Sequence, residues 1–344
     1  MTNTKGKNMN KKVLIIYTGG TIGMKSSDSG FAPTKGYLAE AISHIPDLSS
    51  PSMPEWNLFE MDPLLDSSDM TVKEWNLIGR KIYENYHLYD GFVILHGTDT
   101  MAYTASALSF MLKGLDKPVI ITGSQIPLSE IRSDGRDNLI TSLLIAGEGV
   151  VREVALYFSG KLLRGNRATK MSADDLVAFA SPNFPPLAEV GIAVKYNYAV
   201  IRRCGEEALS FVPLSEIPIG VIKVFPGIQF SLFESIMTDK LSGIVLETFG
   251  AGNIPGGGGK LIPIIKKAFA SGSIIVVCSQ CPGGTVTLGA YKTSSSLKEA
   301  GAVSGKDMTT EAAVAKLYYL FSLGLSGDEI KAYMEKNLRG EMSE

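Results

Sequence analysis

The sequence predicts an α/β protein with a larger N-terminal, mostly parallel sheet flanked by helices and a smaller C-terminal α/β domain built on a second parallel sheet. Apolar runs rich in β-branched residues alternate with longer segments of helical period. A polar, proline-bearing stretch interrupts this alternation, which then resumes. Strands separated by helix-length segments need crossover connections, and these favour parallel sheets covered on both faces.

The first half of the chain supplies the larger sheet. Short β-branched runs predict strands at Val13–Tyr17, Gly91–Leu95, Val119–Thr122 and Val154–Phe158. Helical spacing of apolar residues predicts helices at Met101–Leu112 and Asn138–Ala146. Because helix-length segments separate the later strands, we expect a flavodoxin-like arrangement with helices on the sheet faces.

The alternation decays between Ala180 and Pro218, where the chain becomes polar. This stretch has one short extended run near Gly191–Val194 and includes Pro182, Pro185, Pro186 and Pro213. A chain of 344 residues suggests two domains, with three as the alternative, at roughly 100–200 residues per domain. We therefore predict an N-terminal domain over residues 1–195, a linker over 196–218 and a C-terminal domain over 219–344.

The second half repeats the pattern on a smaller scale. Strands are predicted at Gly220–Val224, Gly243–Glu247 and Ser273–Cys278, and helices at Leu261–Ala270 and Glu311–Leu323. Ser326 and Glu329 form a capping-box pattern before a last helix at Ile330–Asn337. The glycine run Gly256–Gly259 predicts a flexible loop.

Composition and charge favour a cytoplasmic protein with a small-molecule ligand. The net charge is -2, the pI is near 6.0, and the basic residues are scattered, which argues against nucleic acid as a partner. Apolar runs fall far short of the roughly 20 residues that cross a membrane. Residues 1–12 lack the apolar core of a secretory signal, and three cysteines do not make a disulfide framework.

The segment Thr18–Gly23 directly follows the first predicted strand. Ligands of open parallel sheets bind beyond the carboxyl ends of the strands, and glycines leave backbone N–H groups free to face them. A phosphate cradle and a plain structural turn are both alternatives, although the spacing matches neither common nucleotide motif. The functional interpretation is that Thr21 presents a hydroxyl beside amides that stabilise an oxyanion, as acyl transfer requires.

Two further segments follow strands. His96–Met101 places Thr98 and Asp99 at the same edge of the sheet, although either residue also suits a helix cap. Arg164–Lys170 supplies Lys170, which is positioned to meet Asp99 across the cleft. A partly desolvated lysine can accept a proton, whereas most lysines in polar loops are simply solvated.

Together these segments resemble the L-asparaginases of the bacterial type, and most closely their cytoplasmic (type I) branch. The two signatures of that family are matched by Tyr17–Met24 and Gly91–Ala102, in order and at the expected separation. Further similar stretches are Asp66–Met70, Thr122–Gln125, Arg164–Lys170 and Ala180–Asn183. The resemblance covers Lys12 to Glu341.

The resemblance implies hydrolysis of a linear carboxamide: L-asparagine and water give aspartate and ammonia, with no cofactor and no metal. It assigns Thr21 as the nucleophile that forms an acyl-enzyme intermediate. It also assigns a second catalytic set, Thr98, Asp99 and Lys170, in which the lysine is the base. Whether this set activates the attacking water or takes part in the first step is left open.

The resemblance also implies how the substrate is bound. The α-carboxylate and α-amino groups are expected against Asp66, Ser67, Ser68 and Asp99, and Ser124 is a further substrate-binding position. Members of the family are homodimers, often paired into homotetramers as a dimer of dimers. Asn253 matches the position at which a neighbouring subunit's C-terminal domain completes the site.

Two positions depart from the family pattern. The loop after the first signature, expected to be a lid, has Phe31 where a tyrosine normally helps to polarise the nucleophile. Either a water or Tyr37 replaces that phenol, or catalysis is slower than is usual for the family. Glu247 stands where some members bind an asparagine effector through an arginine, so effector activation is not implied.

Other functions remain as alternatives. One is a dual glutaminase–asparaginase, and another is the related amidase that acts on glutamine attached to transfer RNA, whose members carry an extra N-terminal domain. A third is a catalytically weakened, amino-acid-binding homologue, which Phe31 favours. The Cys278 to Cys281 spacing is compatible with redox or zinc chemistry, but the following Pro282 favours a structural turn. His96 is interpreted as a structural hydrogen-bonding residue.

Overall fold

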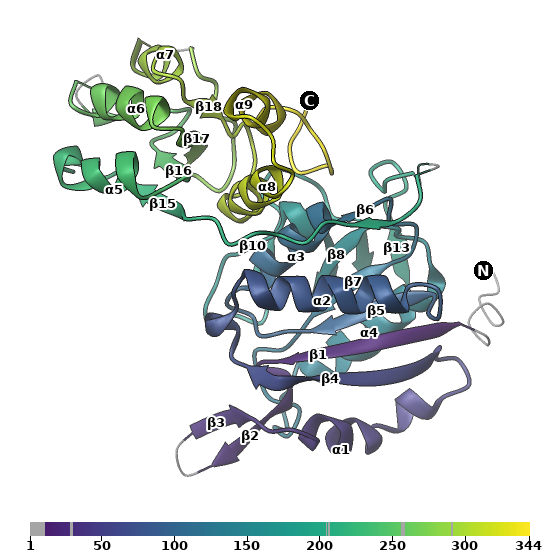
Figure 1. Cartoon of the computed structure of the whole chain (residues 1–344). Coiled ribbons are helices and arrows are strands. Elements are labelled where there is room, and N and C mark those ends of the chain that lie inside the picture. Colours follow the sequence, from purple (N-terminus) through teal and green to yellow (C-terminus); the bar gives the residue numbers. More distant parts are fainter. Residues whose placement is uncertain (1–10, 28–29, 204, 206, 256–258, 290–291) are drawn as a thin grey trace. The chain divides into compact units, whose positions relative to one another are not determined.

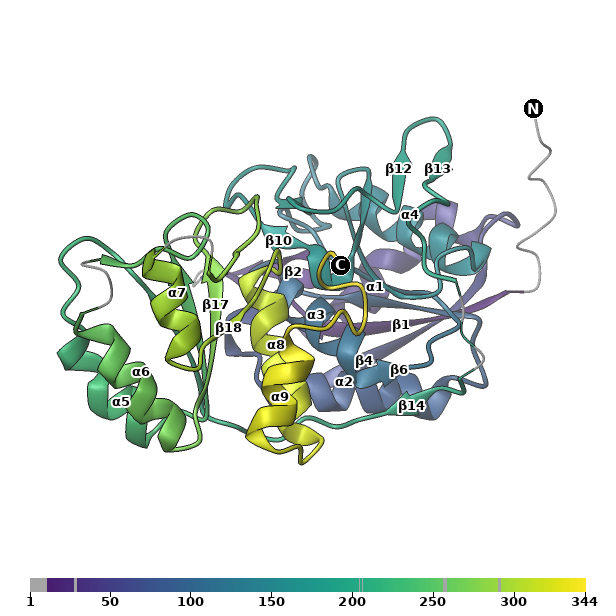
Figure 2. The ribbon, with the colours of Figure 1, turned by 90° about the horizontal axis from the view of Figure 1, so that it is seen from above.

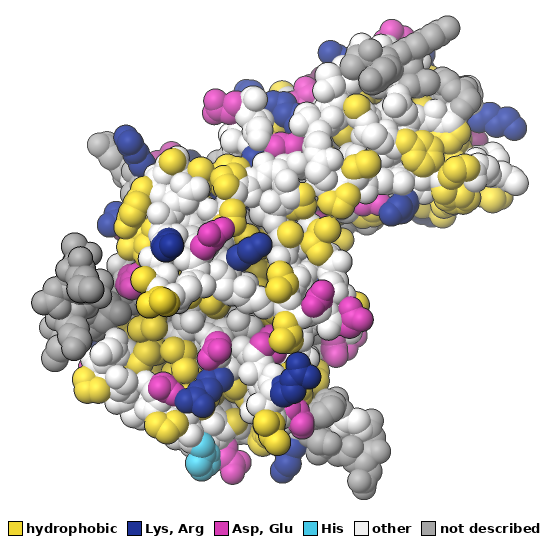
Figure 3. All heavy atoms as spheres, turned by 180° about the vertical axis from the view of Figure 1, so that it is seen from behind, with side chains coloured by type: hydrophobic (Ala, Val, Ile, Leu, Met, Phe, Trp, Pro, Cys, Tyr) yellow, Lys and Arg dark blue, Asp and Glu magenta, His cyan; other side chains and the backbone are white. Residues whose placement is uncertain are grey.

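The computed structural model describes residues 11–27, 30–203, 205, 207–255, 259–289 and 292–344. The chain forms two compact units. Unit 1 comprises the residues up to Ser181 together with Pro185–Pro213, and unit 2 comprises Pro182–Phe184 and Leu214–Glu344. Within the described residues, no helix has both the length and the apolar character needed to span a membrane. On the face shown in Figure 3, basic and acidic side chains are interspersed.

Unit 1 is built on an eight-stranded sheet with the order β13-β12-β9-β8-β7-β5-β1-β4 (Figure 1). The parallel strands are β1 (Lys12–Gly19), β4 (Glu55–Leu65), β5 (Gly91–Leu95), β7 (Val119–Thr122) and β8 (Val154–Phe158). The antiparallel extension consists of β9 (Lys161–Arg164), β12 (Ala188–Val190) and β13 (Val194–Tyr196). The predicted mostly parallel sheet is therefore confirmed.

The order of the parallel strands creates a topological switch point. After β1, the chain adds β4 on one side of it and β5 on the other, and β7 and β8 then follow beyond β5. This is the strand order of flavodoxin-like sheets, in which ligands bind at the point where the direction of winding reverses. The pairing runs from Val13 opposite Gly91 to Tyr17 opposite Leu95, so β1 and β5 end side by side.

Helices cover both faces of this sheet. The amphipathic helix α2 (Val72–Asn85) begins at a capping box formed by Thr71 and Glu74, and it contacts α3 (Met101–Met111). Figure 2 shows α4 (Gly135–Glu148) on the opposite side of β1 from α2. The short helix α1 (Tyr37–Ser43) precedes β4. Nearly every residue of α3 is buried, because α3 packs against the sheet and against α2.

Unit 2 contains a four-stranded, fully parallel sheet with the order β15-β16-β17-β18. Its strands are β15 (Ile219–Lys223), β16 (Gly243–Thr248), β17 (Ile274–Ser279) and β18 (Val303–Ser304). Its helices are α5 (Glu234–Asp239), α6 (Leu261–Ala270), α7 (Lys292–Glu299), α8 (Thr310–Ser322) and α9 (Gly327–Met334). The apolar faces of β15, β16, β17, α5 and α6 form one buried cluster. The predicted capping box of Ser326 and Glu329 is confirmed at the start of α9.

The stretch predicted as a linker, residues 196–218, is divided between the units. Its first part returns to unit 1, where β14 (Ser210–Phe211) pairs with β6 (Leu112–Lys113). The Phe211 ring stacks on Tyr83 of α2, with ring centroids 5.9 Å apart. The proline-rich composition predicted a linker, but Phe211 packs the first part of this stretch against α2. Residues from Leu214 onwards belong to unit 2.

The short extended run predicted near Gly191–Val194 is confirmed only at Val194, which begins β13. Residues 191–193 form the turn between β12 and β13, and Gly191 N–H donates to Ala193 O at 3.3 Å. The strand β4 and the helices α1, α2, α5 and α7 were not predicted. β4 is the edge strand of its sheet and carries Pro63, which weakens its sequence signal but is tolerated at an edge. Residues 256–258 of the predicted glycine loop lie outside the described residues.

Candidate active site

The loops that follow β1, β4 and β5 pack closely against one another at Gly20 and Gly97. Gly20 has a φ of 88°, and a Cβ atom at this position would lie 2.3 Å from the backbone nitrogen of Gly97. A Cβ atom at Gly97 would in turn lie 2.5 Å from Ser67 Oγ. Any side chain at either glycine would therefore force these loops apart. Thr21 and Thr98 each follow one of these glycines directly, so the switch point holds both hydroxyl residues next to the contact.

Thr21 begins a short 3₁₀ turn, Thr21–Gly23, at the end of β1. The turn is anchored at both ends: Gly23 N–H donates to Gly20 O at 3.3 Å, and Leu128 N–H donates to Ile22 O at 3.2 Å. The Ile22 side chain is fully buried. Thr21 itself is only half-buried. The sequence of small residues therefore places a partly accessible hydroxyl on a fixed turn.

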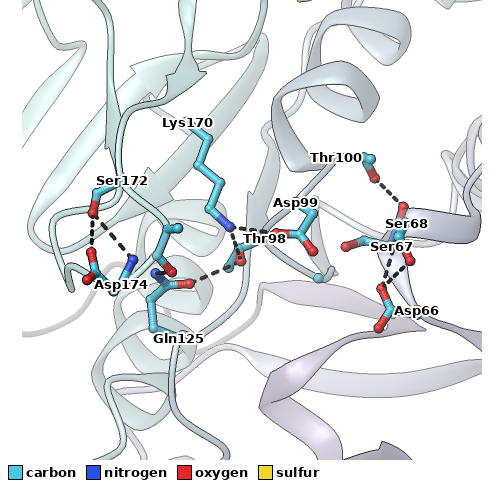
Figure 4. Close-up of polar contacts among 12 residues, drawn as sticks. Asp66, Ser67, Ser68, Thr98, Asp99, Thr100, Gln125, Lys170, Ser172 and Asp174 are labelled. Atoms are coloured by element: carbon cyan, nitrogen blue, oxygen red, sulfur yellow. Dashed lines mark hydrogen bonds and ion pairs between the residues drawn. The ribbon is translucent and has the colours of Figure 1, made fainter.

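Lys170 joins Thr98 and Asp99 in one hydrogen-bonded set (Figure 4). Lys170 Nζ donates to Thr98 Oγ1 at 2.9 Å and to Asp99 Oδ1 at 2.7 Å. The side chain of Lys170 is 18% exposed and that of Asp99 is 64% exposed, so the lysine lies inside the site and the carboxylate at its rim. Thr98 is buried. The structure thus brings together three predicted site residues that are up to 72 positions apart.

A short hairpin carries Lys170. It consists of β10 (Thr169–Lys170) and β11 (Phe179–Ala180), with Lys170 paired to Phe179. Met171 N–H donates to Ala178 O at 2.7 Å, which continues the pairing past the lysine. The Phe179 side chain is buried and packs against Phe158 at the end of β8. This packing ties the hairpin to the central sheet and fixes the direction from which Lys170 enters the site.

Asp66, Ser67 and Ser68 form the turn after β4. Asp66 Oδ1 accepts from both the backbone N–H and the hydroxyl of Ser68, each at 2.9 Å, so this carboxylate caps the turn. Thr100 Oγ1 donates to Ser67 O at 2.6 Å and links the turn to the loop after β5. Asp66 and Ser68 are exposed, whereas Ser67 is buried. A carboxylate and a hydroxyl oxygen are thus exposed on the turn that Thr100 links to the loop of Thr98 and Asp99.

For the remaining predicted site residues, the structure describes the local position in the fold. Ser124 is buried beside the start of α4, where its Cβ lies 3.2 Å from the Cβ that an alanine at Gly135 would carry. Asn253 lies in unit 2 and pairs with Phe249 in an isolated bridge. The backbone of Phe31 belongs to β3 (Gly30–Pro33), but its side chain lies outside the described residues. Their assigned roles stay predictions.

The structure shows the contacts of Tyr37 and Glu247, the two residues named for the departures from the family pattern. Tyr37 begins α1, and its ring lies under the Lys25 ammonium, 5.7 Å from Nζ to the ring centroid. Lys25 belongs to β2 (Met24–Ser27), which pairs with β3 to form the predicted lid. Glu247 Oε1 accepts from Thr310 Oγ1 at 2.6 Å at the start of α8, so its carboxylate has an internal partner.

Gln125 and Thr100 were not predicted to contribute to the site. Gln125 follows β7, the strand next to β5, and its amide accepts from Thr98 Oγ1 at 3.0 Å. The position of Gln125 was a usable sequence signal, because it follows a predicted strand at the same sheet edge as Thr21 and Thr98. Its amide bonds two different loops, and only the folded structure shows which.

His96 is a buried structural group, as interpreted from the sequence. Its Nδ1 lies 2.7 Å from Gly97 O and its Nε2 lies 2.8 Å from Thr104 Oγ1. Thr104 Oγ1 also accepts from the Trp75 indole at 3.0 Å, so its hydrogen is available for Nε2. Burial lowers the pKa of His96 to about 4, and its bond to Gly97 O only partly opposes this shift. The imidazole is therefore neutral at neutral pH.

This burial predicts a dependence of stability on pH. Unfolding restores an ordinary pKa of about 6.5, so the unfolded chain binds a proton between pH 6.5 and 4 that the folded chain does not. The stability is therefore complete above pH 6.5 and is lost as the pH falls towards 4, by about 3 kcal/mol in full. In His96→Gln, the free energy of unfolding, measured with urea at several pH values, is expected to change less with pH than in the wild-type protein. The exposed control His87→Gln should keep the wild-type slope; equal slopes in all three proteins would contradict the assignment.

Cys278 and Cys281 are both free thiols in the structure. Cys278 is buried in β17, and burial raises the pKa of its thiol to about 12. Cys281 is exposed in the turn that follows. Among the described residues, no group of three or more His, Cys, Asp or Glu side chains is arranged to hold a metal ion. The structural interpretation of this motif is therefore favoured.

Comparison with protein families gives matches in both units. Residues 12–202 match the family model described as "Asparaginase, N-terminal". Residues 218–334 match the model described as "Glutaminase/Asparaginase C-terminal domain". The two matches together include every site residue considered above.

Individual proteins are similar over the same span. The chain is 45% identical over 333 residues to L-asparaginase 1 of Escherichia coli (strain K12), with 97% of this chain and 98% of that protein covered. It is also similar to the crystal structure of L-asparaginase I from Vibrio cholerae O1 biovar eltor, with a sequence identity of 47% and a TM-score of 0.90. The match covers 97% of this chain and 99% of that chain. It is also 43% identical over 355 residues to the 60 kDa lysophospholipase of Mus musculus, covering 97% of this chain and 63% of that protein.

Proposed function

Since this chain belongs to the asparaginase family, we propose that it hydrolyses the side-chain amide of free L-asparagine to give aspartate and ammonia. The observation that carries the proposal is the bonded set of Lys170, Thr98 and Asp99, held at the switch point beside the loop of Thr21. The site thus offers a hydroxyl nucleophile and a lysine that can exchange protons.

In the proposed first step, Thr21 Oγ1 attacks the carbon of the side-chain amide. The hydroxyl proton leaves the threonine, the C–N bond breaks, and the amide nitrogen takes up a proton and departs as ammonia. The product is an ester between Thr21 and the aspartyl group. The second step reverses this chemistry with water: its oxygen attacks the ester carbon, aspartate leaves, and Thr21 regains its proton.

Lys170 is the proposed base, and Thr98 connects it to the reacting atoms. The distance of 2.9 Å between Lys170 Nζ and Thr98 Oγ1 is short enough for proton transfer. The exposed Asp99 carboxylate, 2.7 Å from Lys170 Nζ, stabilises the lysine after it has accepted a proton. The same carboxylate is the proposed partner of the substrate's α-amino group.

Substrate orientation is assigned to the turn after β4. Once its hydrogen turns from Asp66 Oδ1 to the substrate, the exposed hydroxyl of Ser68 is a donor for the α-carboxylate, and the Asp66 carboxylate is an acceptor for the α-amino group. An amino acid needs both kinds of partner to be held in one orientation. We further propose that Ser67 and Ser124 line the site and that Asn253 completes it in a homodimer or a dimer of dimers.

Measuring ammonia release from L-asparagine and L-glutamine side by side tests this function. We expect turnover of asparagine that exceeds turnover of glutamine and that a metal chelator does not reduce. Equal turnover of the two substrates would establish the dual glutaminase–asparaginase instead. Calorimetric binding of asparagine without any release of ammonia would establish the non-catalytic homologue and refute the proposal.

A further inference from the structure

The amide orientation of Gln125 follows from its hydrogen bonds. Its Nε2 donates to Ala173 O at 3.2 Å and to Asp175 O at 3.1 Å, and these backbone carbonyls can only accept. Both amide hydrogens are therefore committed to the tip of the hairpin that carries Lys170. The opposite orientation would place the amide oxygen against two carbonyl oxygens. Gln125 Oε1 consequently faces Thr98 (Figure 4).

The backbone of Gln125 is fixed as well. Its N–H lies 3.1 Å from each carboxylate oxygen of Asp134, and the N–H of Ile126 lies 3.0 Å from Asp134 Oδ1. Asp134 immediately precedes α4. Gln125 is therefore held at its main chain by α4 and at its amide by the lysine hairpin. The position of its oxygen does not depend on Thr98.

This fixed oxygen determines which way the Thr98 hydroxyl points. An amide oxygen accepts hydrogen bonds and cannot donate, so Thr98 must direct its hydrogen to Gln125 Oε1 at 3.0 Å. A lone pair of Thr98 Oγ1 is then left to accept from Lys170 Nζ at 2.9 Å. The hydrogen bonds run in one direction, from Lys170 through Thr98 to Gln125.

We propose that Gln125 is a positioning residue of the catalytic set. It fixes the position of Thr98 Oγ1 beside Lys170 Nζ, and it ties the tip of the lysine hairpin to the same point. The inference rests on the proposed function, because its test measures kcat for asparagine hydrolysis. Gln125 acts through Thr98 and Lys170, without touching the reacting atoms.

The test is a double-mutant cycle between Gln125→Met and Thr98→Ala. Methionine matches glutamine in length but neither accepts from Thr98 nor donates to the hairpin. With Thr98 present, we expect Gln125→Met to lower kcat by about tenfold, at little change in KM. With Thr98 already replaced, we expect less than about a twofold further loss, because residues that act through one contact are not additive.

Gln280→Met is the matched control. Its amide also donates to two backbone carbonyls, Val224 O at 2.5 Å and Glu247 O at 2.9 Å, but it belongs to unit 2. We expect lower thermal stability but wild-type kcat and KM in this variant. Equal losses of kcat from Gln125→Met in both Thr98 backgrounds would overturn the inference. A wild-type chain that releases no ammonia would instead refute the proposed function.

Discussion

Thr21→Ala is expected to lower kcat for asparagine hydrolysis by about 10³-fold or more, because alanine has no oxygen with which to form the acyl ester. Lys170→Met is expected to lower kcat by about 10²–10⁴-fold, the range typical of lost proton transfer. Methionine preserves the length of the lysine side chain but removes the contacts to Thr98 and Asp99. Steady-state ammonia release with both variants measures these losses.

The control for the lysine substitution is Lys195→Met. Lys195 is an exposed lysine of the antiparallel extension, in the same unit as the site. We expect this variant to keep wild-type kcat and KM. Thermal unfolding of all three variants establishes that the folded chain is being assayed. Wild-type activity in both Thr21→Ala and Lys170→Met would show that the assigned nucleophile and base are wrong.

Lys316→Met is expected to cost about 3–5 kcal/mol of folding free energy, the range for breaking a buried ion pair. The Lys316 and Glu341 side chains are both 0% exposed, and Nζ lies 2.6 Å from Oε1. Lys316 also donates to Met334 O at 3.1 Å and Lys336 O at 2.5 Å, so α8 holds the segment that follows α9. Burial lowers the pKa of Lys316, and the Glu341 carboxylate opposes that shift.

The physical reason for this large loss is the charge that remains. Without Lys316, the Glu341 carboxylate keeps its bonds from the backbone N–H groups of Leu338 and Arg339 but loses the ammonium group that balances its charge. An uncompensated buried charge is more costly than the pair that it came from. The double variant Lys316→Met, Glu341→Gln is therefore expected to recover part of the stability lost in the single variant. Denaturant unfolding of each variant measures the differences.

An exposed ion pair in the same unit supplies the comparison. Lys267 Nζ lies 3.0 Å from Glu234 Oε1, but the two side chains are 58% and 42% exposed. Lys267→Met is expected to lower the folding free energy far less than Lys316→Met, since solvent screens such pairs. If Lys316→Met were no more destabilising than Lys267→Met, the buried pair would contribute nothing beyond an ordinary surface contact.

The regular elements of the central sheets were predictable because their signals are local. The strand Gly91–Leu95 is buried along its whole length and reads as a continuous apolar run, and its predicted bounds match β5. The capping box at Ser326 depends on two side chains three residues apart. In contrast, the edge strand β4 mixes exposed and buried residues and carries a proline, so its pairing with β1 had no clear local signature.

Some of the site could be predicted for the same reason. Thr21, Thr98 and Lys170 follow predicted strands, and residues at the carboxyl ends of parallel strands share one edge of the sheet. Their roles came from the family resemblance and remain to be tested. The sequence did not indicate that Gln125 bonds both Thr98 and the lysine hairpin, because the three segments are far apart in the chain.

The sequence by itself determined the α/β class, the central strands and the family, because each depends on residue order, spacing and motifs. Tertiary structure alone decided that residues 196–213 return to unit 1 and that Lys316 and Glu341 form a buried ion pair. It also decided that the Thr98 hydroxyl donates to Gln125. A hydrogen bond or an ion pair depends on distances of about 3 Å between atoms, which periodicity along a chain does not specify.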